Sequence, residues 1–309
     1  MGFCFWPGQL SRCSSTACCC GGLCGGFRLM SAARLPRILS SVMFGALALY
    51  LILPMLAVLI YSLARRWTAT ILPDGYTVQY WISALQDPRL FGAFVRSVVL
   101  AGATVAIDVL VVVPATYWAY VRNRRIRIIA EMAAVVPFAL PWVAIAFGIL
   151  LLSGRFAPAL LGTPLLLMLA YAAVHFPFLY WAVDGAMAAA DVVALSEAAE
   201  TCGATPLQII RRVVVPNITG GVVSGGILVF ASSFGEFALV QMLVGGSFET
   251  VPLWSADALR ATLGKFPELA VITFTTFMVL FVLSAILVFG TGAQTIRLLP
   301  GARAVEQRR

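Results

Sequence analysis

Four ionisable residues stand inside long apolar stretches of the chain: Asp108, His175, Asp184 and Glu236. On membrane-insertion scales a charged side chain at the centre of a span costs about 2.5 to 3.5 kcal/mol. Each of these groups therefore needs a hydrogen-bonding partner or a surface that faces water. They are candidates for contact with a polar solute, although a structural hydrogen bond would satisfy them equally well.

Glu236 is the first choice for a residue that lines a pathway or its gate. Ser233 and Gly235 stand beside it, and small residues let helices approach closely and form hydrogen bonds. Asp108 stands among valines and could contact a cation, or it could be a buried or protonated aspartate bonded to a neighbouring helix. We therefore take Glu236, Ser233 and Asp108 as the pathway candidates, and we expect Asp184 to reach the cytoplasmic interface.

The sequence gives little support to an enzyme. His175 is the only histidine, so the chain cannot supply a two-histidine haem or a multi-histidine zinc site, and we expect it to be a hydrogen-bonded packing residue. The only lysine, Lys265, is followed by Phe266, where a phosphate-binding loop needs serine or threonine. We expect no catalytic residue, no metal site and no cofactor in this chain, so any ATP and Mg would be bound by a partner.

Six of the seven cysteines fall within the first 24 residues. They could form a metal cluster, but no histidine or carboxylate joins them, and they cannot staple the rest of the chain through disulfides. The alternative is that residues 1–29 are an unstructured or wrongly annotated extension and that Met30 is the true start, which we favour. The segment has no uninterrupted apolar core of the kind found in a cleaved signal peptide.

The composition is that of a membrane protein. Of its 309 residues 61% are hydrophobic and 11% are charged, with a mean hydropathy of +0.97, whereas soluble domains carry about 25% charged residues. The net charge of +8 comes from arginines clustered between apolar runs. That pattern indicates the positive-inside rule and argues against a nucleic-acid partner.

Six transmembrane helices account for the apolar runs, at about 39–64, 94–120, 128–153, 163–187, 221–244 and 269–291. The arginine-rich turn at 122–127 predicts that both termini lie in the cytoplasm, although Arg65 and Arg66 oppose this orientation. The predicted domains are the extension 1–29, a first span and periplasmic loop 30–90, a core 91–293 with a cytoplasmic loop 188–216, and a cytoplasmic tail 294–309.

Smaller features refine this outline. Thr77 is expected to cap a short amphipathic helix that carries Tyr80, Trp81 and Leu85 at the membrane interface. Prolines inside the spans predict kinks around a pathway or ordinary bundle kinks, and they stand at Pro54, Pro114, Pro137, Pro141 and Pro177.

The loop between the fourth and fifth spans is predicted to form two short helices with a sharp turn. The first covers about 192–202 and is followed by Gly203, which suits a left-handed cap. Thr205, Pro206 and Gln208 then form a capping box, which predicts a second helix that runs to about Val215, before Pro216.

This loop resembles the signature of permease subunits of ATP-driven (ABC-type) importers. The motif is Glu-Ala-Ala, three residues, Gly, nine residues, and then an aliphatic residue, any residue, an aliphatic residue and Pro. It falls on Glu197, Ala198, Ala199, Gly203, Val213, Val215 and Pro216. The resemblance implies that Glu197 faces a basic residue in a groove of the ATPase. The expected coupling residues are Glu197, Ala198, Ala199, Gly203, Pro206, Arg211 and Pro216.

The resemblance also implies a fold and partners. The fold would be an all-α polytopic bundle of the type I ABC importer permease, in the bacterial inner membrane. The partners would be a cytoplasmic ATPase dimer, a second identical or homologous permease, an extracytoplasmic solute-binding protein and membrane lipid. Two rival hypotheses are a proton-coupled carrier that uses Asp108 and Glu236, and a membrane scaffold that transports nothing.

The solute is left open by the sequence. Ser233-Phe-Gly-Glu236-Phe in the fifth span resembles the branch of the family that imports polyamines, iron, sulfate, molybdate and phosphonates. Polyamine, ferric iron and phosphonate are the candidates, and general resemblance slightly favours polyamine.

Overall fold

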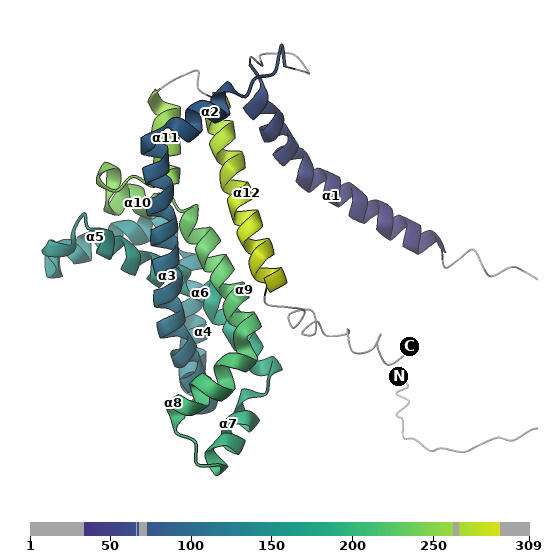
Figure 1. Cartoon of the computed structure of the whole chain (residues 1–309). Coiled ribbons are helices and arrows are strands. Elements are labelled where there is room, and N and C mark those ends of the chain that lie inside the picture. The colour runs from purple at the N-terminus through teal and green to yellow at the C-terminus, as the bar shows by residue number, and fades with distance from the viewer. Residues whose placement is uncertain (1–33, 66, 68–72, 262–265, 291–309) are drawn as a thin grey trace, which may run out of the picture. The chain divides into compact units, whose positions relative to one another are not determined.

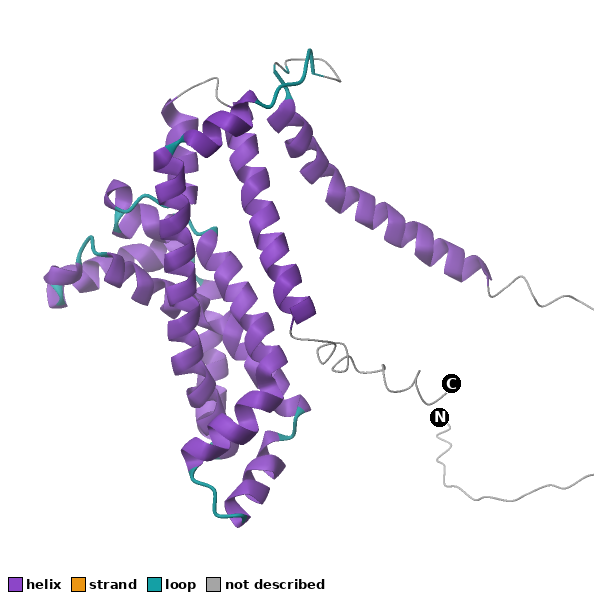
Figure 2. Cartoon of the chain, in the orientation of Figure 1, coloured by secondary structure: helices purple, strands orange, loops and turns teal. Residues whose placement is uncertain are grey.

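The computed structural model describes residues 34–65, 67, 73–261 and 266–290. Within these ranges the regular structure is helical, apart from one isolated bridge between Ala64 and Tyr76 (Figures 1 and 2). The expected all-α fold is therefore confirmed. The extension 1–29 with its cysteines, Lys265 and the tail 294–309 lie outside the described residues, and the predicted domain boundaries remain predictions.

The described residues fall into two units, with the boundary between Leu53 and Pro54. Helix α1 (Arg34–Leu63) crosses this boundary, and its side chains from Ser40 to Leu53 are exposed. All of the packing described below lies within the second unit.

Among the described residues, five stretches of helix are long and apolar enough to cross a membrane. They are α1, α3 (Pro88–Val121), α6 (Pro164–Ala189), the stretch Pro206–Phe234, and α12 (Phe266–Gly290). A sixth crossing is made if the bent pair α4 (Arg124–Ala139) and α5 (Trp142–Phe156) counts as one span. The sequence-based count of six agrees with the structure on that condition.

The predicted third span, 128–153, is broken at Pro141, one of the prolines at which a kink was expected. The helix direction bends by 106° between α4 and α5, with extended backbone at Leu140 and Pro141. Pro141 has no N–H to give to the carbonyl of Pro137, four residues earlier. The indole Nε1–H of Trp142 donates to that carbonyl instead, at 3.0 Å, so the break is satisfied inside the protein.

The prediction for the fifth span, 221–244, was wrong at both ends. The helix begins at Pro206, in the short turn α8 (Pro206–Gln208), and passes through a π-helical segment (Ile209–Val214) into α9 (Val215–Phe234). It stops at Gly235, and a separate helix α10 (Ala238–Leu243) follows. The chain then forms a 3-10 turn (Gly245–Ser247) and α11 (Val251–Ala261).

The predicted amphipathic helix is present as α2 (Gln79–Gln86). The hydroxyl oxygen of Thr77 accepts from the backbone N–H of Gln79, at 3.2 Å. The indole of Trp81 donates to the hydroxyl of Ser62 at the end of α1, at 3.2 Å. This short helix therefore connects the end of α1 to the start of α3.

Polar interactions hold both ends of α3 to other parts of the chain, and these interactions are the ties compared below. Near its start, Arg89 pairs with Glu249 at 2.6 Å, and the Ser97 hydroxyl accepts from the backbone N–H of Val251 at 2.9 Å. Beyond its end, Arg122 pairs with Glu200 at 2.6 Å. At about 1.5 Å per residue, the 34 residues of α3 separate these ties by about 50 Å.

Helices α3, α6 and α9 form the centre of the bundle, and α6 and α9 approach most closely at two glycines. A Cβ placed on Gly221 would lie 2.5 Å from the Cβ of Ala186, and one placed on Gly225 would lie 2.9 Å from the Cα of Leu179. Glycines four residues apart let two helix backbones touch, which is a common packing mode in membranes. Buried side chains surround this contact, among them Tyr117, Leu179, Val183, Ile218 and Val229.

The glycine contact gives a stability prediction. Gly225→Ala should destabilise the protein by about 1 to 3 kcal/mol, because the α6 backbone must move to admit a methyl group. Gly226→Ala is the matched control, since a Cβ there meets only Val105, at an ordinary 3.5 Å. The thermal midpoint of the purified protein in detergent measures both. Equal midpoints for the two variants would contradict the proposed packing.

Candidate functional site

The loop between α6 and α9 begins with helix α7 (Val192–Thr201), one face of which is anchored in the bundle. Asp191, immediately before the helix, has a left-handed backbone with φ of +48°. Val192 and Ser196 are buried on the inner face, and the Ser196 hydroxyl donates to the Val192 carbonyl at 2.7 Å. Glu197 and Ala198 are exposed on the outer face, and Ala199 is half-buried.

The turn after α7 is the left-handed cap that the sequence predicts. Gly203 has a φ of +78°, and its N–H donates to the Glu200 carbonyl at 2.9 Å. The N–H of Ala204 donates to the Ala199 carbonyl at 3.1 Å. These two bonds form a Schellman motif, which ends the helix and pairs carbonyls that would otherwise be left open.

The capping box is also confirmed. The side-chain oxygen Oε1 of Gln208 accepts from the backbone N–H of Thr205 at 2.9 Å, and Pro206 takes the first helical position. Cap, proline and glycine together fix the direction in which the chain leaves α7.

The sequence predicted that the second helix of the loop ends before Pro216. In the structure this helix does not end there. It continues through the π-helical segment into α9, with Ile209 and Val214 buried against the bundle. Pro216 lacks the N–H that a regular α-helix would use, and a wider turn before it relieves the clash of its ring. The amide of Asn217 donates to the Val213 carbonyl at 2.7 Å, which adds a bond near the proline. The loop is thus joined to α9 without a flexible break.

The loop also contacts the other central helices. Helix α7 packs against the end of α3 and against α6, at the end of α3 far from α2 and α11 (Figure 1). The Arg122–Glu200 pair is partly exposed, so it contributes more to position than to stability. The sequence did not single out this pair, because nothing in the residue pattern shows that positions 122 and 200 meet.

The outer surface of the loop, which we call the elbow surface, carries the predicted coupling residues. Glu197, Ala198, Pro206, Arg211 and Pro216 are all exposed. Within the described part of the chain Glu197 makes no ion pair. Leu207 is 74% exposed, and the sequence analysis did not name it. A free carboxylate, small side chains and an apolar side chain on a rigid support suit a protein partner.

The ionisable residues of the spans have separate surroundings. Asp184 pairs with Arg127 at 2.8 Å. The ring nitrogen Nδ1 of His175 lies 2.8 Å from the Tyr171 carbonyl, and the imidazole ring packs on Trp142 and Tyr171. These contacts fit the packing role expected of His175 and give Asp184 a structural partner.

Glu236 has a structural use that the sequence analysis left open. It is 4% exposed, and its carboxylate accepts from the backbone N–H groups of Ala238 at 3.1 Å and Leu239 at 2.9 Å. The carboxylate thus satisfies the first amides of α10, which lie directly after the break in the fifth span. Ser233 is buried, and its hydroxyl has no hydrogen-bond partner among the described residues.

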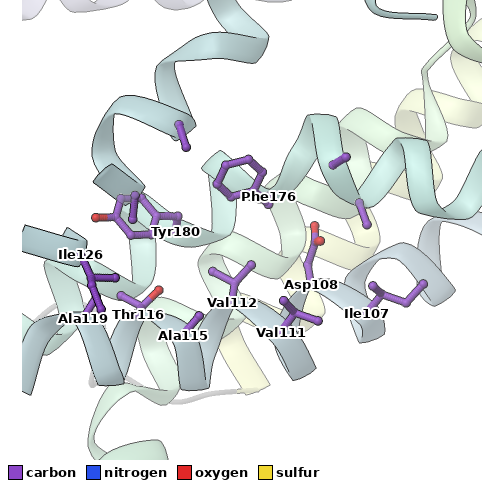
Figure 3. Close-up of a pocket in the computed structure, with 14 residues that line it drawn as sticks. Ile107, Asp108, Val111, Val112, Ala115, Thr116, Ala119, Ile126, Phe176 and Tyr180 are labelled. Atoms are coloured by element: carbon purple, nitrogen blue, oxygen red, sulfur yellow. The ribbon is translucent and has the colours of Figure 1, made fainter. Parts of the chain in front are cut away.

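Asp108 lies in a different place, in a cavity of about 390 Å³ between α3, α4 and α6 (Figure 3). It is 2% exposed, and its Oδ2 atom has no hydrogen-bond partner within the described ranges. Ser233 and Glu236 are not among the residues that line this cavity. The structure therefore does not bring the three pathway candidates together, and their contact with a solute stays a prediction.

Comparison with known proteins decides the family. Residues 111–296, which include the whole loop, match the model of the binding-protein-dependent transport system inner membrane component. The chain belongs to this family of importer permeases. It is a multi-pass bacterial membrane protein that serves as a permease subunit of an ABC importer.

Two curated permeases show the range of its relatives. The permease is 33% identical over 233 residues to the molybdenum transport system permease protein ModB of Mycobacterium tuberculosis, covering 70% of this chain and 84% of that one. It is 25% identical over 222 residues to the putative 2-aminoethylphosphonate transport system permease protein PhnV of Salmonella typhi, covering 70% and 80%. Neither name supports the slight preference for polyamine.

A solved structure supports the fold. The permease resembles a chain in the crystal structure of a bacterial ABC transporter involved in the import of the acidic polysaccharide alginate. The TM-score is 0.59 at 16% identity, and the match covers 83% of this chain and 96% of that one.

The left-handed turn gives a second prediction. A Cβ on Gly203 would meet nothing within 4 Å, so any cost of substitution is conformational and amounts to about 1 to 2 kcal/mol. Gly203→Val should speed amide hydrogen exchange across 192–216, as measured by mass spectrometry. Gly203→Asn is the control, because asparagine tolerates this conformation and should change exchange much less. Identical exchange in both variants would show that the turn does not hold the loop.

Proposed function

We propose that the elbow surface binds a separate ATPase and transmits its movement to the membrane helices. The observation that carries this proposal is the unbroken helical path from the elbow into α9, beneath an exposed and unpaired Glu197. The Glu-Ala-Ala spacing and the family membership support the same role. ATP and Mg would be bound by the partner, and this chain would supply only the coupling contact.

The route of the movement follows from the packing. A force on α7 or on Arg211 would act on α9 directly, through the π-helical segment. Helix α9 would carry α6 with it, because the glycine contact leaves no space for the two to slide apart. Such rigid-body motion of packed helices is a known way to switch between two states. Two such subunits would alternate between outward- and inward-facing states around the solute.

The proposed solute is a small oxyanion, delivered by an extracytoplasmic binding protein. The support is the pair of relatives named for molybdenum and 2-aminoethylphosphonate transport. Molybdate and 2-aminoethylphosphonate are both small and carry an oxyanion, which polyamines lack.

Charge reversal at the elbow tests the coupling. Glu197→Lys should lower uptake of labelled molybdate or 2-aminoethylphosphonate at least tenfold, which corresponds to about 1.4 kcal/mol or more. The new ammonium would face the basic residue expected on the ATPase, so like charges would repel. The measurements are uptake by cells that carry the variant in place of the natural chain, and the amount of ATPase recovered with the purified permease.

Asp257→Lys is the matched control, since it makes the same reversal on α11, near the other end of α3. It should leave ATPase recovery unchanged. Full uptake and full ATPase recovery in Glu197→Lys would remove the elbow from the coupling role.

The orientation of the loop can be tested through Cys202, which is exposed. With the six N-terminal cysteines replaced by serine, a membrane-impermeant maleimide should label Cys202 only in inside-out vesicles. The reason is that an ATPase contact must lie in the cytoplasm. Labelling of Cys202 in intact spheroplasts would place the loop on the wrong side of the membrane.

A further inference from the structure

The cavity between α3, α4 and α6 has two polar groups without partners on a mainly apolar wall, which also includes Tyr180, whose hydroxyl donates to the Arg127 carbonyl at 3.4 Å. Asp108 and Thr116 are eight residues apart on α3, and both line the cavity (Figure 3). Asp108 is 2% exposed and Thr116 is 3% exposed. Neither Oδ2 of Asp108 nor Oγ1 of Thr116 has a hydrogen-bond partner in the described structure.

The free hydroxyl of Thr116 differs from those of three other helical threonines. Thr104, Thr219 and Thr275 each donate to the carbonyl four residues earlier, at 2.7 to 2.9 Å. Within the ranges that the structure describes, Thr116 makes no such bond. Its O–H therefore stays available to a group inside the cavity.

The charge of the lining favours a cationic group near Asp108. None of the fourteen described lining residues is basic, and Arg127, close by in sequence to the lining residue Ile126, is already paired with Asp184. Burying a carboxylate costs free energy unless a hydrogen-bonding or oppositely charged group pairs with it. Phe176 lies across the cavity from Val112, and an aromatic ring also favours a nearby cation (Figure 3).

The spacing fits a short molecule with opposite charges at its two ends. Eight residues of α-helix advance by about 12 Å. A two-carbon chain between an amine and an oxyanion, with one hydrogen bond of about 2.8 Å at each end, is of comparable length. Val112 lies between the two polar positions and would face the methylene groups (Figure 3). Alanines at 115, 130, 133 and 172 keep the space open.

We propose that this cavity is a binding site for a small zwitterion that bears a primary ammonium group and an oxyanion. The ammonium donates to the carboxylate of Asp108, and the hydroxyl of Thr116 donates to the oxyanion. This inference rests on the proposed importer function and narrows its solute class to aminoalkyl oxyanions. A wholly anionic solute such as molybdate meets an uncompensated carboxylate here and is disfavoured.

The test is equilibrium binding to the purified full-length permease in lipid nanodiscs, measured by calorimetry. The probes are 2-aminoethylphosphonate, ethylphosphonate, which lacks only the amine, and molybdate. The aminated compound should bind at least tenfold more tightly than the other two. Equal affinity for 2-aminoethylphosphonate and ethylphosphonate, or no binding of the former, overturns the proposal without any variant.

Matched variants locate the site. Asp108→Asn should weaken binding of 2-aminoethylphosphonate at least tenfold, while Asp257→Asn, which removes a carboxylate outside the cavity, should not change it. Thr116→Val should weaken binding severalfold, while Thr104→Val, on the same helix but outside the lining, should not. Unchanged affinity in both cavity variants would assign the binding elsewhere and sink the inference.

The two hypotheses fail separately. Binding in nanodiscs requires no ATPase, so loss of zwitterion selectivity with intact Glu197-dependent coupling would overturn the cavity site alone. Selective binding with no effect of Glu197→Lys on uptake would instead overturn the coupling role.

Discussion

The close contact of α6 with α9 is the constraint on which the rest of the bundle depends. Lipid is as apolar as a leucine side chain, so there is no hydrophobic drive to bring two membrane helices together, and packing must do it. Gly221 and Gly225 allow the α9 backbone to touch Ala182 and Leu179 of α6. The elbow begins where one of these helices ends and continues into the other, so its position follows from this contact.

The breaks in the helices obey a second constraint, which is that no backbone polar group can be left open in lipid. At the α4–α5 bend the indole N–H of Trp142 donates to the carbonyl of Pro137, to which Pro141 has no N–H to donate. After α9 the carboxylate of Glu236 accepts hydrogen bonds from the first backbone N–H groups of α10. In both places a side chain from the break itself supplies the missing bond, so irregular backbone is held inside the protein.

The sequence predicted those features that short-range chemistry determines. The left-handed Gly203, the capping box at Thr205 and Gln208, and the amphipathic α2 follow from residues within a few positions of one another. Hydropathy located the spans because each requires a long apolar run. The family that the comparisons identify was therefore recognisable from the sequence.

Other features depend on contacts that the sequence does not display. The bend at Pro141 could have been a mild kink, and only the Trp142 bond shows how a sharp break is tolerated. The end of the second elbow helix was misplaced because Pro216 usually stops a helix, whereas here a wider turn admits it. The cavity at Asp108 and the Arg122–Glu200 pair join residues from different helices, so no local pattern reveals them.

The π-helical segment sets the angle between the elbow and the glycine face of α9. Each residue of an α-helix turns the chain by about 100°, and a π-type turn contains one more residue than a regular one. Each π-type residue therefore turns the chain by less than 100°, and the six residues 209–214 rotate it about as far as five residues of an α-helix would. Forcing these six residues into a regular α-helix would rotate everything before them by about 100° relative to Gly221. Glu197 would then point in another direction while every helix remained intact, so the docking direction depends on the width of this turn.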